Sequence, residues 1–198
     1  MKSLALFDFD GTVTQSDSFT PFIFFACSKR RIAIGVIFLS PFILLYKLGI
    51  LPTTIMRQLV AFFAFYRRST AEISALGKAY ATHKLSDVVC DKAKQRLAWH
   101  INQGDAVVIV SASLNVYLKN WCDVEGYKLI CTELESRNGK LTGRYQGSDC
   151  CAGEKVRKIK QEITLDDYHT IYAYGDTKED FQMLEIADIS YYRWQIQH

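Results

Sequence analysis

The most unusual feature of the sequence is a long segment that lacks acidic residues. No aspartate or glutamate occurs in the 54 positions from 18 to 71. The same segment carries seven basic residues, namely Lys29, Arg30, Arg31, Lys47, Arg57, Arg67 and Arg68. The rest of the chain holds the other 17 of 24 basic residues and all 21 acidic ones, so its net charge is negative. This asymmetry predicts a basic, apolar surface for an anionic partner, either lipid or nucleic acid.

Proline, low-complexity tracts and paired cysteines are also scarce. With only 3 prolines, 49% hydrophobic residues and no repeat among 198 residues, the composition is that of a folded chain rather than a disordered one. The six cysteines form no C-x-x-C pair, and the first apolar run is too short for a secretory signal. We therefore expect free thiols and a cytoplasmic protein. The length accommodates one domain, or one domain with a modest insertion.

Apolar runs alternate with amphipathic segments and predict an α/β fold. We expect buried strands over residues 3–9, 106–113, 127–134 and 170–176. We expect helices over 87–103, 114–123, 153–163 and 178–187, the first of them capped by Asp87, and further helices within 18–84. Asn138-Gly139 predicts a hairpin between extended segments. Strands that alternate with helices imply a parallel sheet with helices on both faces.

Polar side chains follow three of the predicted strands. Asp8 and Asp10 end the first strand, Ser111 lies near the end of the second, and Asp176 ends the last. In open α/β sheets this edge is where ligands bind. One carboxylate there can attack an electrophile while its neighbour moves a proton. The Ser111 hydroxyl and nearby backbone N–H groups suit an anion.

Two further groups point to phosphate chemistry. Lys155 is a point charge suited to phosphate, and Asp176 and Asp180 offer the hard oxygen ligands that Mg²⁺ prefers. Taken singly, Ser111 could cap a helix, Lys155 could lie on the surface, and Asp176 could start a helix. Together, in this order and at strand ends, the residues favour phosphoryl transfer through an aspartyl-phosphate.

These motifs resemble those of the haloacid dehalogenase-like (HAD) hydrolase superfamily. The resemblance rests on D-x-D-G-T-V-T at 8–14, the strand with Ser111, Lys155, and G-D-x-x-x-D at 175–180. The segment NGKLTGRYQGSDCCAGEKV is similar to the phosphoserine-phosphatase-like subfamily IB. The resemblance implies a Rossmann-like core of residues 1–17 and 85–198, with an all-helical cap, residues 18–84, inserted after the first motif.

The resemblance also implies a role for each motif residue. Asp8 is expected to be the nucleophile, and Asp10 the general acid and then the general base. The residues expected to bind the phosphoryl group are Ser111, Ala112 and Lys155. Mg²⁺ is expected on Asp8, the backbone carbonyl of Asp10 and Asp176, with support from Asp180, Gly11 and Thr12. Since dehalogenases of the superfamily lack the second aspartate, Asp10 implies phosphate chemistry.

The segment expected to form the cap is very apolar. Residues 32–51 carry one charge and are long enough to span a bilayer. A crossing is disfavoured, because the segments before and after must join one sheet and the only partner run, 59–66, is too short. Two interpretations stay open: helices buried against one another, or a peripheral surface for anionic lipid. The missing acidic residues favour the second. Nucleic acid is not expected, because the basic residues flank aliphatic runs.

The insert also bears on the substrate. With DGTVTQSDSF, the apolar cap is similar to the phosphatidylglycerophosphatase C-type branch, which implies a lipid phosphate and a site on the cytoplasmic membrane face. Phosphoserine phosphatases carry an amine-binding glutamate where this chain has Gln15, Ser16 and Asp17, and Asp17 either replaces it or caps the next helix. The alternatives are a phosphatase of a small soluble metabolite, a sugar phosphomutase, and an inactive scaffold that binds a phosphorylated ligand.

Overall fold

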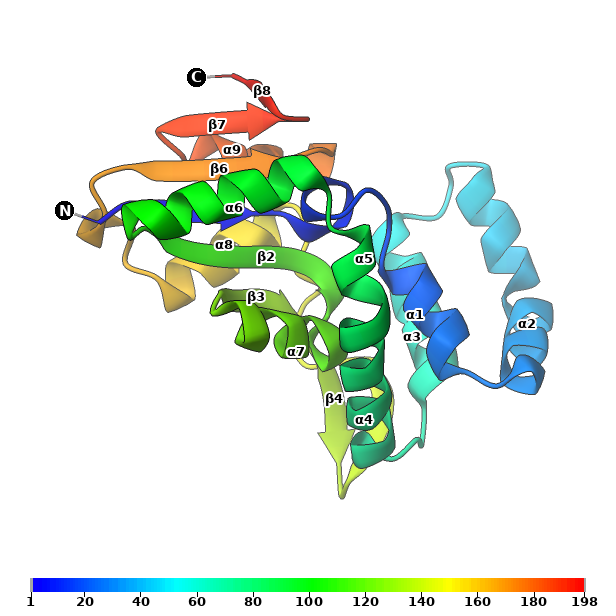
Figure 1. Cartoon of the computed structure of the whole chain (residues 1–198). Coiled ribbons are helices and arrows are strands. Elements are labelled where there is room, and N and C mark those ends of the chain that lie inside the picture. The colour runs from blue at the N-terminus through cyan, green and yellow to red at the C-terminus, as the bar shows by residue number, and fades with distance from the viewer. Residues whose placement is uncertain (1, 198) are drawn as a thin grey trace.

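The computed structural model describes residues 2–197, and its centre is a six-stranded sheet in the order β3-β2-β1-β6-β7-β8 (Figure 1). The strands of this sheet are β1 (Leu4–Phe7), β2 (Ala106–Leu114), β3 (Lys128–Thr132), β6 (Ile171–Gly175), β7 (Ile189–Tyr192) and β8 (Gln195–Ile196). All neighbouring pairs are parallel except β7 and β8. The predicted α/β fold with a parallel sheet is confirmed. The two short strands at its edge, β7 and β8, were not predicted.

Helices cover both faces of the sheet, which explains why its strands are continuous apolar runs. On β1, Leu4 and Leu6 pack in the cluster that contains side chains of α8 (Gly153–Glu162) and α9 (Phe181–Glu185). Ala5 and Phe7 point to the other face and pack in the cluster with α6 (Asp91–Gln103) and α7 (Asn115–Glu125). In Figure 1, α6 lies on the near side of the sheet and α8 on the far side.

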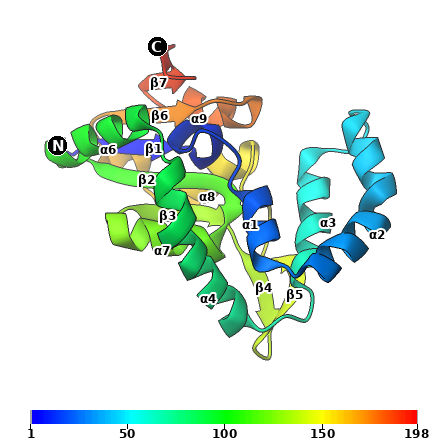
Figure 2. The same cartoon turned by 45° about the vertical axis from the view of Figure 1, so that its right-hand side comes forward.

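Four α-helices lie within residues 18–84, where helices were expected. They are α1 (Phe19–Ala26), α2 (Lys29–Lys47), α3 (Thr53–Phe65) and α4 (Thr70–Tyr80). Figure 2 shows α2 and α3 side by side, projecting away from the sheet, whereas α4 packs on α7. The bounds of the cap stay a prediction. Within residues 2–197, no helix has both the length and the apolar character that a bilayer crossing requires.

The start of α6 corrects one prediction. The helix begins at Asp91, after Cys90, and Asp87 lies in the separate short turn α5 (Ser86–Val88). The intervening backbone is extended because it pairs with the first motif: Gln15 donates to the Val88 carbonyl at 3.1 Å, and the Cys90 N–H donates to the Val13 carbonyl at 2.9 Å. In the last turn of α6, His100 is buried and Ile101 is exposed, so the apolar residue predicted by helical spacing from Ala93 and Leu97 does not continue the buried face.

The predicted hairpin is confirmed. Asn138 and Gly139 join β4 (Leu134–Arg137) to β5 (Lys140–Tyr145), and both have positive φ, 51° and 72°. This is the backbone that a two-residue type I′ turn requires, and asparagine and glycine adopt it at little cost. The hairpin packs against α3 and thereby connects the projecting helices to the rest of the fold. The six cysteines are free, as expected.

Candidate active site

The first motif forms a tight turn immediately after β1. Asp8 follows the strand, and residues 9–13 turn so that Gly11 adopts a φ of +86°. A Cβ atom on Gly11 would lie 2.3 Å from Oδ2 of Asp176, so a side chain there is excluded by both backbone and space. The Thr12 hydroxyl donates to Oδ1 of Asp176 at 3.2 Å. Gly11 and Thr12 therefore bring the first motif against the last, in support of the predicted site.

Lys155 joins the carboxylates of two motifs. Its side chain, only 2% exposed, comes from α8 and its Nζ contacts Oδ1 of Asp8 and, at 2.7 Å, Oδ1 of Asp180. The alternative of a surface lysine is therefore wrong. Burial raises the pKa of Asp8 to about 8, although the nearby Lys155 lowers it. Burial opposes the charge of Lys155, but Asp8 and Asp180 raise the pKa of this amine and keep it protonated.

Asp180 is held rigidly by the loop that carries Asp176. Its Oδ2 accepts from the backbone N–H groups of Asp176 and Thr177, at 3.2 and 3.0 Å, and from the Thr177 hydroxyl at 3.1 Å. These bonds and the Lys155 contact engage both of its oxygens. Asp180 is thus placed to orient Lys155 and the Asp176 loop, which is the supporting role that the sequence predicts.

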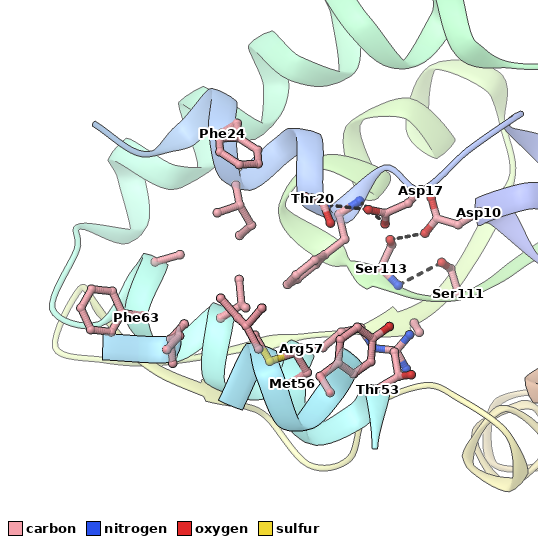
Figure 3. Close-up of a pocket in the computed structure, with 18 of the residues that line it drawn as sticks. Asp10, Asp17, Thr20, Phe24, Thr53, Met56, Arg57, Phe63, Ser111 and Ser113 are labelled. Atoms are coloured by element: carbon pink, nitrogen blue, oxygen red, sulfur yellow. Dashed lines mark hydrogen bonds between the residues drawn. The ribbon is translucent and has the colours of Figure 1, made fainter. Parts of the chain in front are cut away.

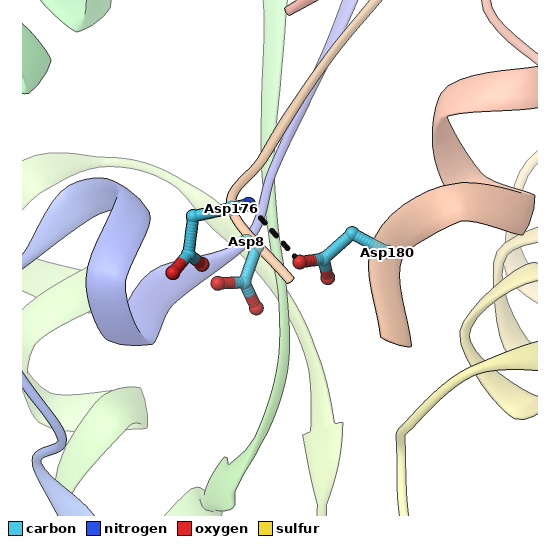
Figure 4. A group of neighbouring side chains, drawn as sticks. All are labelled: Asp8, Asp176 and Asp180. Carbon is cyan, nitrogen blue, oxygen red and sulfur yellow. Dashed lines mark hydrogen bonds between the residues drawn. The ribbon is translucent and has the colours of Figure 1, made fainter. Parts of the chain in front are cut away.

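The carboxylates of Asp8, Asp176 and Asp180 form one cluster (Figure 4). One oxygen from each lies within 4.8 Å of the others. Three carboxylates beside one ammonium leave excess negative charge in a buried site, which a divalent cation relieves. The donors are hard oxygen atoms of the kind that Mg²⁺ takes, so the residues fit this ion. Both oxygens of Asp180 are engaged by Lys155 and the Asp176 loop, so Asp8 and Asp176 are the carboxylates predicted to hold the ion. The expected carbonyl ligand at Asp10 stays a prediction.

Figure 3 shows the Asp10 carboxylate directed toward the Ser113 hydroxyl. Its Oδ1 accepts from the Ser18 N–H at 2.7 Å, and its Oδ2 accepts from the Ser113 hydroxyl. Tyr117 approaches the Ser18 hydroxyl at 3.1 Å. Burial raises the pKa of Asp10, while the hydrogen bonds from Ser113 and Ser18 lower it. A raised pKa and a fixed orientation suit a carboxyl that donates a proton.

Ser18, Ser113 and Tyr117 were not predicted from the sequence as the group around Asp10. A signal existed for Ser113, because it stands two residues after Ser111, and side chains at i and i+2 of a strand share a face. Ser113 in turn donates its N–H to Oγ of Ser111 at 3.0 Å. Ser18 and Tyr117 lie 99 positions apart and carry no local signal.

Ser111 is inside β2 rather than at its end. The strand continues to Leu114, with an irregular register after Ser111, because β3 still pairs with Leu114 through Thr132. The Ser111 side chain is buried and, with Ala112, faces the same cavity as Asp8 and Lys155. The structure thus brings the predicted phosphate-binding residues together, and their role in binding stays a prediction.

Comparison with known proteins assigns the fold to a family. The model of the haloacid dehalogenase-like hydrolases matches residues 5–185. The chain belongs to this family. It is 32% identical to the protein CicA of Caulobacter vibrioides, over 96% of this chain and 85% of CicA. It is 24% identical to a histidinol-phosphatase of Neisseria meningitidis serogroup C, over 94% of this chain and 88% of that protein.

Two solved structures support the same HAD fold. A protein of unknown function from Bordetella pertussis Tohama I superposes with a TM-score of 0.82 at 24% identity, covering 96% of this chain and 89% of its own. A substrate-bound phosphoserine phosphatase superposes with a TM-score of 0.65 at 18% identity, covering 96% and 85%. The prediction of a HAD hydrolase is confirmed, and the relatives named as phosphatases support a HAD-type phosphatase.

The residues predicted to be catalytic open into a cavity of about 850 Å³. Asp8, Asp10, Ser111 and Lys155 line one end of it. The rest of it is lined mostly by apolar side chains of α1, α2 and α3: Ile23, Phe24, Ile32, Leu39, Ile43, Met56, Val60 and Phe63. Arg31 and Lys47 are also present in this lining. In Figure 3, Phe24 and Phe63 lie far from Asp10 and Ser111, on opposite walls. One cavity therefore joins a highly charged end to a long apolar end.

Arg57 also lines the cavity and links α3 to the loops of the core. It comes from α3 and forms ion pairs with Asp149, at 3.0 Å, and Glu179, at 3.3 Å. Asp149 is buried, so this contact ties the projecting helices to the loops of the HAD core. The sequence reasoning treated Arg57 only as part of a basic segment. Its partners lie 92 and 122 positions away, so no local pattern could have identified them.

Asp17 caps α1, as one of its two interpretations proposed. Its oxygens accept from the N–H groups of Phe19 at 2.9 Å and Thr20 at 3.0 Å. The same carboxylate lines the cavity (Figure 3). Its role as a replacement for the amine-binding glutamate is untested.

Proposed function

We propose that this HAD hydrolase is a Mg²⁺-dependent phosphomonoesterase that works through an aspartyl-phosphate and acts on a membrane lipid phosphate such as phosphatidylglycerophosphate. The observation that carries the proposal is the single cavity that joins the Asp8 and Asp10 end to the apolar chamber of α1, α2 and α3. Its volume of about 850 Å³ lies in the range of ligand sites. Its charged residues lie at one end and its apolar residues at the other, which suits an amphiphilic ligand.

In the first step, an Asp8 oxygen attacks phosphorus and the bond from phosphorus to the ester oxygen breaks. Asp10 gives its proton to that oxygen, which leaves as an alcohol. In the second step, Asp10 takes a proton from water, whose oxygen attacks the phosphorus and frees Asp8 and inorganic phosphate. Lys155 and the Ser111–Ala112 backbone hold the phosphoryl oxygens. Bound Mg²⁺, held by Asp8 and Asp176, supplies positive charge that neutralises those oxygens.

The lipid part of the proposal rests on the apolar chamber. A polar leaving group such as an amino acid would meet mostly apolar side chains there, apart from Arg31 and Lys47, and an unpaired polar group costs free energy when it leaves water. Asp17 is already engaged at the start of α1, which weakens the case for an amine-binding carboxylate. An alkyl chain needs only apolar contact, which Leu39, Ile43 and Phe63 offer.

A soluble phosphate ester is the second candidate substrate. The relative named as a histidinol-phosphatase supports it, since that protein aligns with 94% of this chain. The phosphoserine phosphatase fold is also shared. An inactive scaffold has less support, because the predicted catalytic residues meet at one end of the cavity.

The test is phosphate release by the purified protein with Mg²⁺ or with EDTA. Phosphatidylglycerophosphate in mixed micelles is compared with phosphoserine, histidinol phosphate and a short-chain phosphate ester. We expect turnover of the lipid, loss of turnover in EDTA, and none in Asp8→Asn. Preference for a soluble ester would leave the phosphatase but overturn the lipid substrate. Release by Asp8→Asn equal to wild type would overturn the nucleophile.

A substitution inside the cavity tests the lipid substrate more directly. Leu39→Trp places bulk in the apolar chamber and should lower turnover of the lipid much more than turnover of the short-chain ester. Val124→Trp is the matched control, because Val124 is exposed on α7, away from the cavity and from α2. Equal effects of Leu39→Trp on both substrates would contradict the assignment of the chamber to an alkyl chain.

A further inference from the structure

Helix α2 has two apolar faces, and only one of them faces the cavity. Ile32, Leu39 and Ile43 line the cavity between α1, α2 and α3. On the opposite face, side chains at helical spacing form a stripe that we call the α2 outer stripe: Ile34, Ile37, Phe38, Leu44, Leu45 and Leu48. The cavity accounts for the first face, so the outer stripe needs a separate explanation.

The outer stripe is exposed to solvent. Ile37 is 70% exposed, and Phe38 is 67% exposed although one side of its ring stacks on Phe63 of α3; along α2 only Gly35 is buried. Ile50, shortly after the helix, is a further exposed apolar side chain. Scattered apolar residues are common on protein surfaces, but a contiguous row along a whole helix marks an interaction site. The expectation that the apolar helices are buried against one another is therefore wrong for this face.

The charges around the stripe indicate which partner it takes. Exposed Lys29 and Arg30 begin α2, and exposed Lys47 ends it. No acidic residue lies anywhere in 18–71. A second copy of this chain would bring the same basic groups together and repel itself. An anionic bilayer instead offers negative headgroups to the basic ends and an acyl boundary to the stripe.

We propose that the α2 outer stripe docks on the surface of an anionic lipid bilayer, with the helix lying in the headgroup region. A helix of 19 residues is about 28 Å long, so its basic ends would contact headgroups at both ends of an apolar row. Because the opposite face of α2 lines the cavity, docking brings the apolar end of the cavity to the membrane. The functional role of this docking surface rests on the proposed lipid substrate, but binding to a bilayer can be measured without any turnover.

Co-sedimentation with lipid vesicles tests the docking. Wild type and the inactive Asp8→Asn variant should both sediment with vesicles of phosphatidylcholine and phosphatidylglycerol, and much less with phosphatidylcholine alone. The double variant Ile37→Ser/Phe38→Ser should lower the partition constant at least about 10-fold. Lys29→Gln/Arg30→Gln should remove most of the preference for anionic vesicles.

A matched control separates this surface from general apolar exposure. Val124 on α7 is 84% exposed and lies outside α2, so Val124→Ser should leave vesicle binding unchanged. Thermal unfolding of each variant checks that the fold is intact. Two results would overturn the proposal: no binding to anionic vesicles by folded wild type, or equal binding by the Ile37→Ser/Phe38→Ser variant.

Self-association is the competing outcome. If wild type forms a dimer in analytical ultracentrifugation that the stripe variant loses, and vesicles do not dissociate it, the occupant is a second copy and the membrane proposal is wrong. The proposed function fails by a different readout. A protein that binds anionic vesicles but releases no phosphate from any ester keeps the docking surface and loses the enzyme.

Discussion

Replacing Lys155 by methionine tests the electrostatic core of the site. The methionine keeps most of the apolar stem but removes the ammonium that contacts Asp8 and Asp180. Because Lys155 is 2% exposed, water cannot replace the lost charge. Removal of one partner of a buried ion pair costs about 3–5 kcal/mol. We expect Lys155→Met to lower the free energy of unfolding by that amount, a large share of the stability of a domain.

The loss should depend on pH in a definite direction. Burial already raises the pKa of Asp8 to about 8, and without Lys155 nothing opposes that effect as strongly. A carboxyl whose pKa is raised in the folded state stabilises the fold at low pH, and this contribution disappears as the pH rises through the folded pKa. Because loss of Lys155 raises this pKa further, the deficit of Lys155→Met relative to wild type should grow as the pH rises through about 8 and level off at lower pH.

Urea unfolding followed by fluorescence of the 3 tryptophans measures this loss. EDTA is present throughout, so that no bound cation replaces the ammonium. Lys160→Met is the matched control, because Lys160 lies on the same helix and is exposed. We expect that control to change stability by less than about 0.5 kcal/mol. A loss below about 1 kcal/mol for folded Lys155→Met would refute the reasoning from buried charge.

Two further predictions concern backbone and pH. Gly11→Ala places a Cβ atom 2.3 Å from the Asp176 carboxylate, which must move, so we expect turnover to fall about 100-fold. Gly49→Ala is the control, because Gly49 has a φ of +72° but no described atom within 4 Å, and its turnover should be unchanged. Equal turnover in both variants would refute the steric argument. Burial lowers the pKa of His100 below its usual 6.5, so the unfolded state binds the proton first and wild-type stability should fall as the pH drops from about 7 to about 5. Urea midpoints of His100→Gln should fall less over that range, while exposed His83→Gln keeps the wild-type slope; identical slopes would contradict the role of His100.

The surroundings of His100 could not be predicted from the sequence. The sequence offered no ligand spacing for this histidine, yet its ring lies between Asp105, at 2.8 Å, and the Tyr174 hydroxyl, at 2.9 Å. Asp105 is five positions away, but Tyr174 is 74 positions away on β6. A contact of that range depends on the order of the strands in the sheet, and periodicity within one segment carries no information about it.

The sequence by itself determined the parts of this protein that depend on local pattern. Apolar runs of strand length predicted the sheet, Asn138-Gly139 predicted the hairpin, and Asp8, Lys155 and Asp176 predicted the charged site. Each signal is local because backbone conformation and the direction of a side chain are fixed by near neighbours. The acid-free segment also indicated a basic, apolar surface.

Only the tertiary structure decided how these parts meet. It moved the start of α6 to Asp91, because the preceding backbone pairs with the first motif. It gave Asp10 its partners Ser18 and Ser113, and it tied Arg57 to distant carboxylates. It also divided the apolar residues of α2 between a cavity and an exposed stripe. Both faces of that helix are rich in apolar residues, and they differ in that one lines the cavity beside α3 while the other is exposed.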